Sequence, residues 1–179
     1  MKALSLYRFI IFFLLTLLIC VNGIYAQTPV YLSGITQNLV TPVRVAIDKN
    51  DIIYVTDASQ KLILKYDASG NFLGTITPGG SPLSIAINEN NRIFIGDGET
   101  GNILKLDTSG TPTVIYTGTV FPSDMVFVSD SIYIVDSKLL QVVVIDQSGN
   151  FVRTIGSGTF TYPVGIAYNP QNNRLLVSE

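Results

Sequence analysis

The chain contains 179 residues with no histidine, no tryptophan and one cysteine, and its formal net charge at pH 7 is −2. Phosphate neutralisation dominates affinity for nucleic acids, so a mildly acidic chain without basic clusters is not expected to bind them. The lack of histidine also excludes zinc sites built on imidazole.

The first 26 residues have the pattern of an export signal. Lys2 and Arg8 precede an apolar run at residues 9–21, and a small residue, Ala26, ends the segment. A charged start, an apolar centre and a small residue at the cleavage point are typical of a signal peptide. The alternative is an uncleaved anchor, but the run is shorter than the roughly 20 residues that a helical span needs. We expect cleavage after Ala26 and a secreted, periplasmic or cell-surface protein with no membrane span after cleavage.

Cleavage would leave residues 27–179 without a cysteine, because Cys20 is the only one in the chain. Lipid attachment at Cys20 is rejected, since lipoprotein signals carry a small residue before the cysteine and Ile19 is not small. No disulfide can form in the mature chain, so packing alone must stabilise it. Removal of the signal also leaves nine basic residues against thirteen acidic ones.

A unit of about forty residues repeats through the mature chain, which is typical of repeat architectures. The units align on prolines spaced 40, 40 and 41 residues apart: PVRVAID from Pro42, PLSIAIN from Pro82, PSDMVFV from Pro122 and PVGIAYN from Pro163. Each segment is short, rich in β-branched or aliphatic residues and bounded by turn formers, so each predicts a strand.

Further strands follow in each unit. A second block ends at Asp57, Asp97, Asp136 and Glu179, and a third block is followed in the first three units by an Asp-x-Ser-Gly turn at residues 67–70, 107–110 and 146–149. In such a turn the aspartate can accept backbone hydrogen bonds, and the glycine can take the left-handed conformation. Each complete unit is predicted to be a four-stranded antiparallel meander, and no helical period is visible.

Continuous apolar runs distinguish a β-propeller from a two-sheet sandwich. Residues 52–55 and 142–145 are apolar throughout, which indicates strands buried on both faces, as in a blade packed between two others. Ala46, Ala86 and Ala167 match in the first strand, where small residues suit strands that converge on an axis. A sandwich stays the alternative, although it does not require a forty-residue repeat.

The segment from Pro42 to Asp48, the IYVTD strand that ends at Asp57 and the LILKYD strand that ends at Asp67 together resemble the NHL repeat. The resemblance covers residues 41–179 and implies an all-β propeller of four-stranded blades. WD40 blades are not indicated, because the Trp-Asp signature is absent. NHL repeats usually carry glycine two places after the proline, and only Gly165 follows that rule; Arg44, Ser84 and Asp124 occupy the matching positions.

The number of repeats is smaller than the resemblance implies. NHL propellers resemble six-bladed rings, whereas this sequence supplies about three and a half blades, at residues 41–80, 81–120, 121–161 and 162–179. Residues 27–40 are expected to provide a strand, at 30–35, that closes the last blade of a ring. We therefore expect the sequence to be truncated at its C-terminus.

The loops that enter each first strand and those that join the second and third strands should share one face, the channel-mouth face. Arg44, Ser84 and Asp124 are candidate contacts there for a polar or anionic ligand, although Arg44 could instead pair with Asp124 or Asp57. Phe121 and Tyr162 are candidate apolar contacts at the rim, with packing between blades as the alternative.

Carboxylates at the ends of the second strands form a second candidate site. Asp57, Asp97 and Asp136, together with Glu179, carry the oxygen ligands that Ca²⁺ prefers. The alternative is that they accept turn hydrogen bonds from the backbone, which their identical placement in every blade favours.

Three classes of function fit these features to different degrees. The leading one is an exported binding or scaffold module for a protein or a small polar ligand. The second is a propeller hydrolase or lyase, similar to gluconolactonases, with a metal in the channel; Asp97, Asp124 and Asp136 would supply only part of its ligands. RNA binding, as in some NHL proteins, conflicts with the export signal and the acidic balance.

Overall fold

The computed structural model describes residues 34–179. The predicted signal peptide at residues 1–26 and most of the predicted strand at 30–35 lie outside this part of the chain. Every regular element from residue 34 onward is a β-strand. No helix in the described residues is long and apolar enough to cross a membrane.

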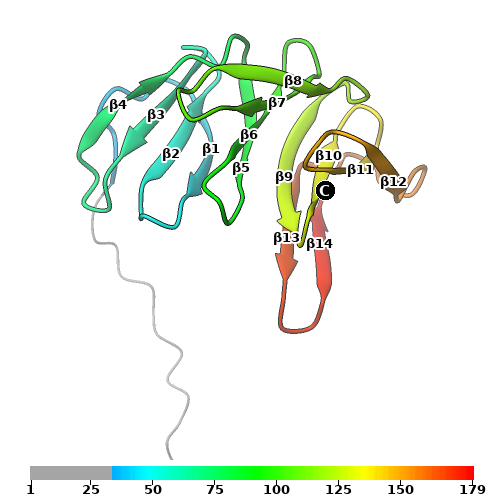
Figure 1. The fold of residues 1–179 in the computed structure, drawn as a ribbon. Helices are drawn as coiled ribbons and strands as arrows, with labels where there is room; N and C mark the ends of the chain where they lie inside the picture. The colour runs from blue at the N-terminus through cyan, green and yellow to red at the C-terminus, as the bar shows by residue number, and fades with distance from the viewer. Residues whose placement is uncertain (1–33) are drawn as a thin grey trace, which may run out of the picture. The chain divides into compact units, whose positions relative to one another are not determined.

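Within residues 34–179, fourteen strands form three four-stranded antiparallel sheets and one two-stranded sheet (Figure 1). The first sheet contains β1 (Pro42–Ile47), β2 (Ile53–Asp57), β3 (Leu62–Tyr66) and β4 (Phe72–Ile76). The second contains β5 (Pro82–Ile87), β6 (Ile93–Asp97), β7 (Ile103–Leu106) and β8 (Pro112–Tyr116). The third contains β9 (Pro122–Val128), β10 (Ser131–Asp136), β11 (Gln141–Asp146) and β12 (Phe151–Ile155). The fourth contains β13 (Gly165–Asn169) and β14 (Arg174–Ser178).

Each sheet is a meander whose strands follow chain order, and the sheets contact one another through their first strands. β1 contacts β5, β5 contacts β9, and β9 contacts β13. The proline-led segments therefore lie side by side, as expected of the inner strands of propeller blades. The predicted all-β fold of propeller blades, three complete and one partial, is confirmed.

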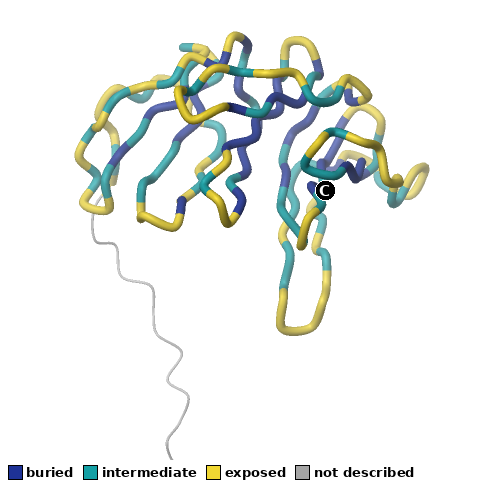
Figure 2. The backbone as a smooth tube through the Cα atoms, in the orientation of Figure 1, coloured by how far each residue is buried: buried dark blue, intermediate teal, exposed yellow. Residues whose placement is uncertain are grey.

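The cores of the protein lie between neighbouring blades. Phe94 of the second blade packs with Met125 and Ile134 of the third, and Ile63 of the first blade packs with Ile85 of the second. Burial on both faces explains why the middle strands are continuously apolar: all of β6 is buried, whereas the outermost strands are exposed over much of their length (Figure 2).

The Asp-x-Ser-Gly turns adopt the predicted geometry and also join neighbouring blades. Gly70, Gly110 and Gly149 have φ values of 84°, 87° and 91°, the left-handed region that glycine favours. A Cβ at Gly110 would lie 3.3 Å from Ile76 of the preceding blade. A Cβ at Gly70 would lie 3.1 Å from Ile35. The segment before β1 therefore packs on the turn of the first blade, as the outer strand of the preceding blade packs on the same turn of the second and third blades.

Two blade faces carry exposed apolar side chains. In the first blade, Ala46 packs toward the second blade, whereas Val45 and Ile47 point the other way and are 62% and 61% exposed. In the fourth blade, Ala167 pairs with Leu176 in the β13–β14 ladder, and Leu176 is 59% exposed.

Candidate functional site

In each of the first three blades, the first strand has a β-bulge at its start, on the channel-mouth face. The proline of the first strand pairs with the aspartate that ends the second strand, as Pro82 pairs with Asp97, and the register then shifts. The residue after the proline is left without a direct partner: Val43, Leu83 or Ser123. Bulges re-aim side chains beside functional sites, and here the bulge frees Leu83 to face the loops.

The strand-end carboxylates Asp57, Asp97 and Asp136 are buried and bind the loops of this face. Asp57 accepts hydrogen bonds from the backbone N–H of Val40 at 2.7 Å, of Thr41 at 2.9 Å and of Gln60 at 3.1 Å. Burial alone would raise the pKa of Asp57, but these hydrogen bonds and one from the Gln60 side chain outweigh it and hold the pKa well below its usual range. Each such aspartate therefore ties the entering loop to the turn after the second strand.

The same arrangement recurs in the other blades. Asp97 accepts from Ser81 N–H at 2.8 Å and from Glu99 N–H at 3.0 Å. Asp136 accepts from Val120 N–H at 2.7 Å and from Leu139 N–H at 2.9 Å. In residues 34–179 no group of three acidic or other ligating side chains lies close enough to hold a metal ion. The geometry is that of turn hydrogen bonds, and Ca²⁺ binding by Asp57, Asp97 and Asp136 stays a prediction.

The structure brings two of the three channel-mouth candidates together. Arg44 Nε lies 3.3 Å from Asp124 Oδ1, and their side chains are 30% and 20% exposed. Arg44 Nη2 also donates to the Val164 carbonyl at 2.7 Å, and Asp124 accepts from Ile166 N–H at 3.0 Å. Arg44 of the first blade thus reaches the third and fourth blades, in the arrangement anticipated as the alternative to ligand contact.

The third candidate, Ser84, lies away from solvent. Its side chain is fully buried, and Oγ donates to the Pro122 carbonyl at 2.8 Å in the next blade. A Cβ at Gly96 would collide with this hydroxyl, so the serine fills the gap between two backbones. Ser84 links the second blade to the third, and in this structure its hydroxyl does not face the channel mouth.

A hollow of about 280 Å³ opens on the channel-mouth face between the first, second and third blades. Leu83 and Phe121 form apolar walls, and Lys61 and Glu99 form an exposed ion pair at 2.8 Å that joins the turns of two blades. The sequence indicated Phe121 as a rim residue, but Leu83 and the Lys61–Glu99 pair were not predicted. The signal for Leu83 is that the bulge frees this residue, and it becomes visible only once the strand register is known.

Exposed apolar side chains also gather on the loops of this face. Val40, Val120, Leu139 and Tyr162 are 66%, 52%, 40% and 51% exposed. Three of them stand just before the strand-one prolines, and Leu139 lies in the turn between β10 and β11. The turns of the opposite face, at residues 48–51, 67–70, 88–91 and 107–110, carry no exposed large apolar residue. The channel-mouth face is therefore the more apolar of the two loop faces.

The fold and its blade contacts define the chain as a partial β-propeller. No family model matches the sequence, and no curated protein matches it. Solved structures of six-bladed β-propellers do match. A structure of a nidogen–laminin complex aligns with a TM-score of 0.71 and 22% identity over 77% of this chain and 56% of that chain.

Two further structures are similar. Virginiamycin B lyase from Staphylococcus aureus, in an inactive form with quinupristin, has a TM-score of 0.68 and 16% identity over 87% of this chain and 55% of its own. Hydrazine synthase from Kuenenia stuttgartiensis has a TM-score of 0.68 and 14% identity over 84% of this chain and 45% of its own. The chain spans about half the length of the propellers that it matches, and likenesses at this identity show the fold alone.

Proposed function

We propose that the chain is an exported NHL-type β-propeller that acts as a binding or scaffold module and engages a protein partner through the channel-mouth face. The observation that carries the proposal is that exposed apolar side chains lie on the loops of that face, which also holds a hollow walled by Leu83 and Phe121. Exposed apolar groups beside a charged rim are typical of protein interaction sites.

The rigidity of this face supports the same function. Its loops are held by buried carboxylates, as in Asp136, whose side chain accepts backbone hydrogen bonds from Val120, Phe121, Lys138 and Leu139. Binding residues on loops fixed by a rigid scaffold lose little conformational entropy when a partner docks. The Lys61–Glu99 pair at the rim offers both charges to a polar group of the partner.

Arg44 adds a contact for an anionic group of the partner or for a small polar ligand. Its guanidinium is partly exposed and already holds Asp124, so a bound carboxylate would compete with that aspartate. A ligand at Arg44 should therefore bind more weakly than one at an unpaired arginine.

The test is selection of peptides from a display library on the immobilised protein, followed by affinity measurements on variants. Leu139→Ser and Tyr162→Ser should each weaken binding of the selected peptides about tenfold, the loss expected for a central apolar contact. Leu73→Ser is the matched control, because Leu73 is 52% exposed on the outer strand β4. Equal losses in all three variants, or a loss only in Leu73→Ser, would contradict the proposed face.

A further inference from the structure

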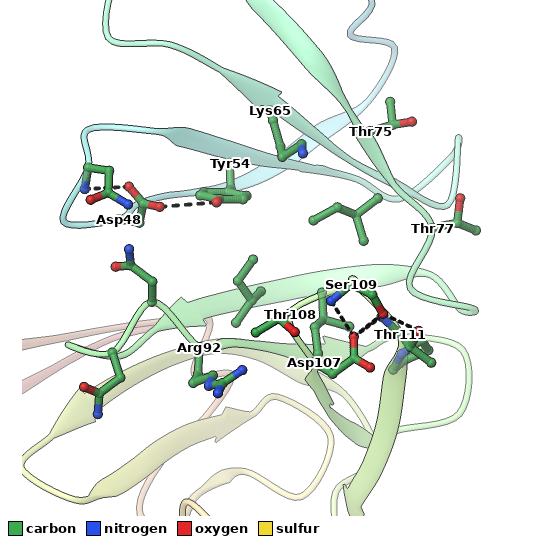
Figure 3. A pocket seen from close by; sticks show the side chains of 18 residues that line it. Asp48, Tyr54, Lys65, Thr75, Thr77, Arg92, Asp107, Thr108, Ser109 and Thr111 are labelled. Carbon is green, nitrogen blue, oxygen red and sulfur yellow. Dashed lines mark hydrogen bonds between the residues drawn. The ribbon is translucent and has the colours of Figure 1, made fainter.

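A groove of about 730 Å³ separates the first two blades on the side away from the channel mouth (Figure 3). Its walls come from the β1–β2 turn and the outer strands of the first blade, and from the Asp107–Gly110 turn and the start of β6 in the second. The lining is largely polar, with hydroxyl groups from Thr75, Thr77 and Thr108. The groove is separate from the channel-mouth face and does not depend on the function proposed above.

Two basic side chains enter this groove without a carboxylate partner. Lys65 extends from β3 of the first blade, and Arg92 lies before β6 of the second (Figure 3). The ion pairs in the described residues are Arg44–Asp124 and Lys61–Glu99, so neither groove cation takes part in one. All thirteen acidic residues of the sequence lie within residues 34–179, so the remaining part of the chain has no carboxylate side chain to offer them.

Two cations of the second and third blades behave differently. Lys105, which matches Lys65 in the second blade, lies 5.6 Å from the centre of the Phe94 ring. Arg153 lies over Tyr133 in the third blade and donates to its hydroxyl. Contact with an aromatic face stabilises a cation. No such contact involves Lys65 or Arg92 in the described residues, so both stay available to an anion.

The groove contains two aspartates, Asp48 and Asp107, and they differ in how many hydrogen bonds their carboxylate oxygens already accept. Asp48 accepts hydrogen bonds from Asn50 N–H, Ile52 N–H and the Tyr54 hydroxyl, so it is committed to its own turn. Asp107 Oδ1 accepts from Ser109 and Thr111, but no described residue donates to Oδ2. This oxygen is therefore free to accept from a ligand.

The open oxygen results from one substitution in the repeat. In the turns of the first and third blades, an asparagine donates to the second aspartate oxygen: Asn71 to Asp67 and Asn150 to Asp146, both at 2.8 Å. In the second blade the matching residue is Thr111, whose hydroxyl lies 2.9 Å from Ser109 Oγ and forms no hydrogen bond with that oxygen. The turn that faces the groove is thus the one that keeps an acceptor for a ligand.

We propose that this groove binds an acidic saccharide. Its acid groups, uronates or sulfates, pair one with Lys65 on the wall of the first blade and another with Arg92 on the wall of the second, and the sugar hydroxyls bond Asp107 Oδ2 and the threonine hydroxyls. Arginine and lysine suit carboxylate and sulfate oxygens, whereas a carboxylate acceptor suits a hydroxyl donor. A bare inorganic anion fits less well, because Asp107 would repel it and most of the groove would stay unfilled.

The test is calorimetric titration of the full chain with trigalacturonate, a sulfated trisaccharide and neutral maltotriose. Binding of either acidic sugar with little binding of maltotriose is the expected result, and the stronger of the two identifies the acid group. Lys65→Gln and Arg92→Gln should each lower the affinity about tenfold, the loss typical of one charge-assisted hydrogen bond. Arg153→Gln removes a cation from the third blade and should leave the affinity unchanged.

Thr111→Asn gives a second, independent arm, because it adds the asparagine found in the other two turns and removes no charge. It should occupy Asp107 Oδ2 and lower the affinity severalfold while the thermal midpoint stays at or above that of the unchanged protein. The proposal is overturned if maltotriose binds as tightly as the acidic sugars, if none of the three binds, or if folded Lys65→Gln and Arg92→Gln variants bind like the unchanged protein.

Discussion

At the third position of the proline-led segments, the four blades carry four different residues: Arg44, Ser84, Asp124 and Gly165. The three side chains at this position each bond a neighbouring or opposite blade. Ser84 bonds Pro122, Asp124 bonds Ile166 and Arg44 bonds Val164, across 38, 42 and 120 residues of sequence. The variation therefore reflects different partners between blades, and only the exposed part of Arg44 is left to serve a ligand.

Removing Asp124 should destabilise the fold. Asp124→Ala removes the acceptor of the Ile166 N–H and the ion-pair partner of Arg44 Nε, and such losses cost about 1–3 kcal/mol. Urea unfolding of Arg44→Met, Asp124→Asn and the double variant should give a coupling free energy of about 1 kcal/mol. Strict additivity of the two single changes would contradict a direct interaction.

The pH dependence of stability should carry the signature of Asp57. Its pKa is lowered in the folded state from a reference of 3.8, so its contribution is full above the unfolded-state pKa and is lost as the pH falls toward the folded one. Asp57→Asn should therefore lower the free energy of unfolding at neutral pH and flatten its decline below about pH 4. Asp130→Asn, in the exposed β9–β10 turn, controls for the change in net charge. A decline in Asp57→Asn as steep as in the unchanged protein would contradict the role.

At the scale of the element, the Asp-x-Ser-Gly turns act as contacts between blades as well as reversals of the chain. The sequence predicted their conformation, because aspartate and glycine are the residues that this turn requires. It could not predict that Gly110 and Gly149 lie against β4 and β8, the outer strands of the preceding blades, since those contacts depend on how the blades stack. Gly70 meets Ile35 in the same way that Gly110 meets Ile76. That residues 30–35 close the last blade of a ring stays a prediction, because most of that segment lies outside the described residues.

Two alanine substitutions separate the role of a turn glycine as a contact between blades from its role in reversing the chain. Gly149→Ala and Gly158→Ala both place a side chain at positive φ, 91° and 76°. A Cβ at Gly149 would collide with the carbonyl of Ile115, whereas nothing lies within 4 Å of one at Gly158. We expect Gly149→Ala to lose about 2 kcal/mol more unfolding free energy than Gly158→Ala, as for overpacking at a tight contact. Equal losses would mean that the turn does not pack tightly on the neighbouring blade.

The candidate sites, too, could be predicted from the sequence only in part. The repeat predicted the strands, the channel-mouth face and Phe121 at its rim, since these follow from local pattern and blade connectivity. The hollow at Leu83 depends on a bulge, and the groove at Lys65 and Arg92 depends on the spacing of two blades. Neither feature has a signal in the order of residues along one strand.

At the scale of the whole molecule, the exposed apolar side chains of the first and fourth blades should promote self-association. Val45 and Ile47 on the first blade are each more than half exposed, as is Leu176 on the fourth. Contiguous exposed apolar surface favours association in water. Sedimentation at increasing concentration should show larger species, and Ile47→Lys should raise the monomer fraction. Leu73→Lys on β4 is the control, and a protein that stays monomeric at every concentration would contradict the expectation.

The proposed function requires a partner to dock on the channel-mouth face. The most direct measurement is amide hydrogen exchange of the protein with and without a peptide selected in the display experiment. We expect protection in the β2–β3, β6–β7 and β10–β11 turns and in the loops that enter β5, β9 and β13. Protection confined to the turns at residues 48–51, 88–91 and 146–149, with no change at the channel mouth, would contradict it.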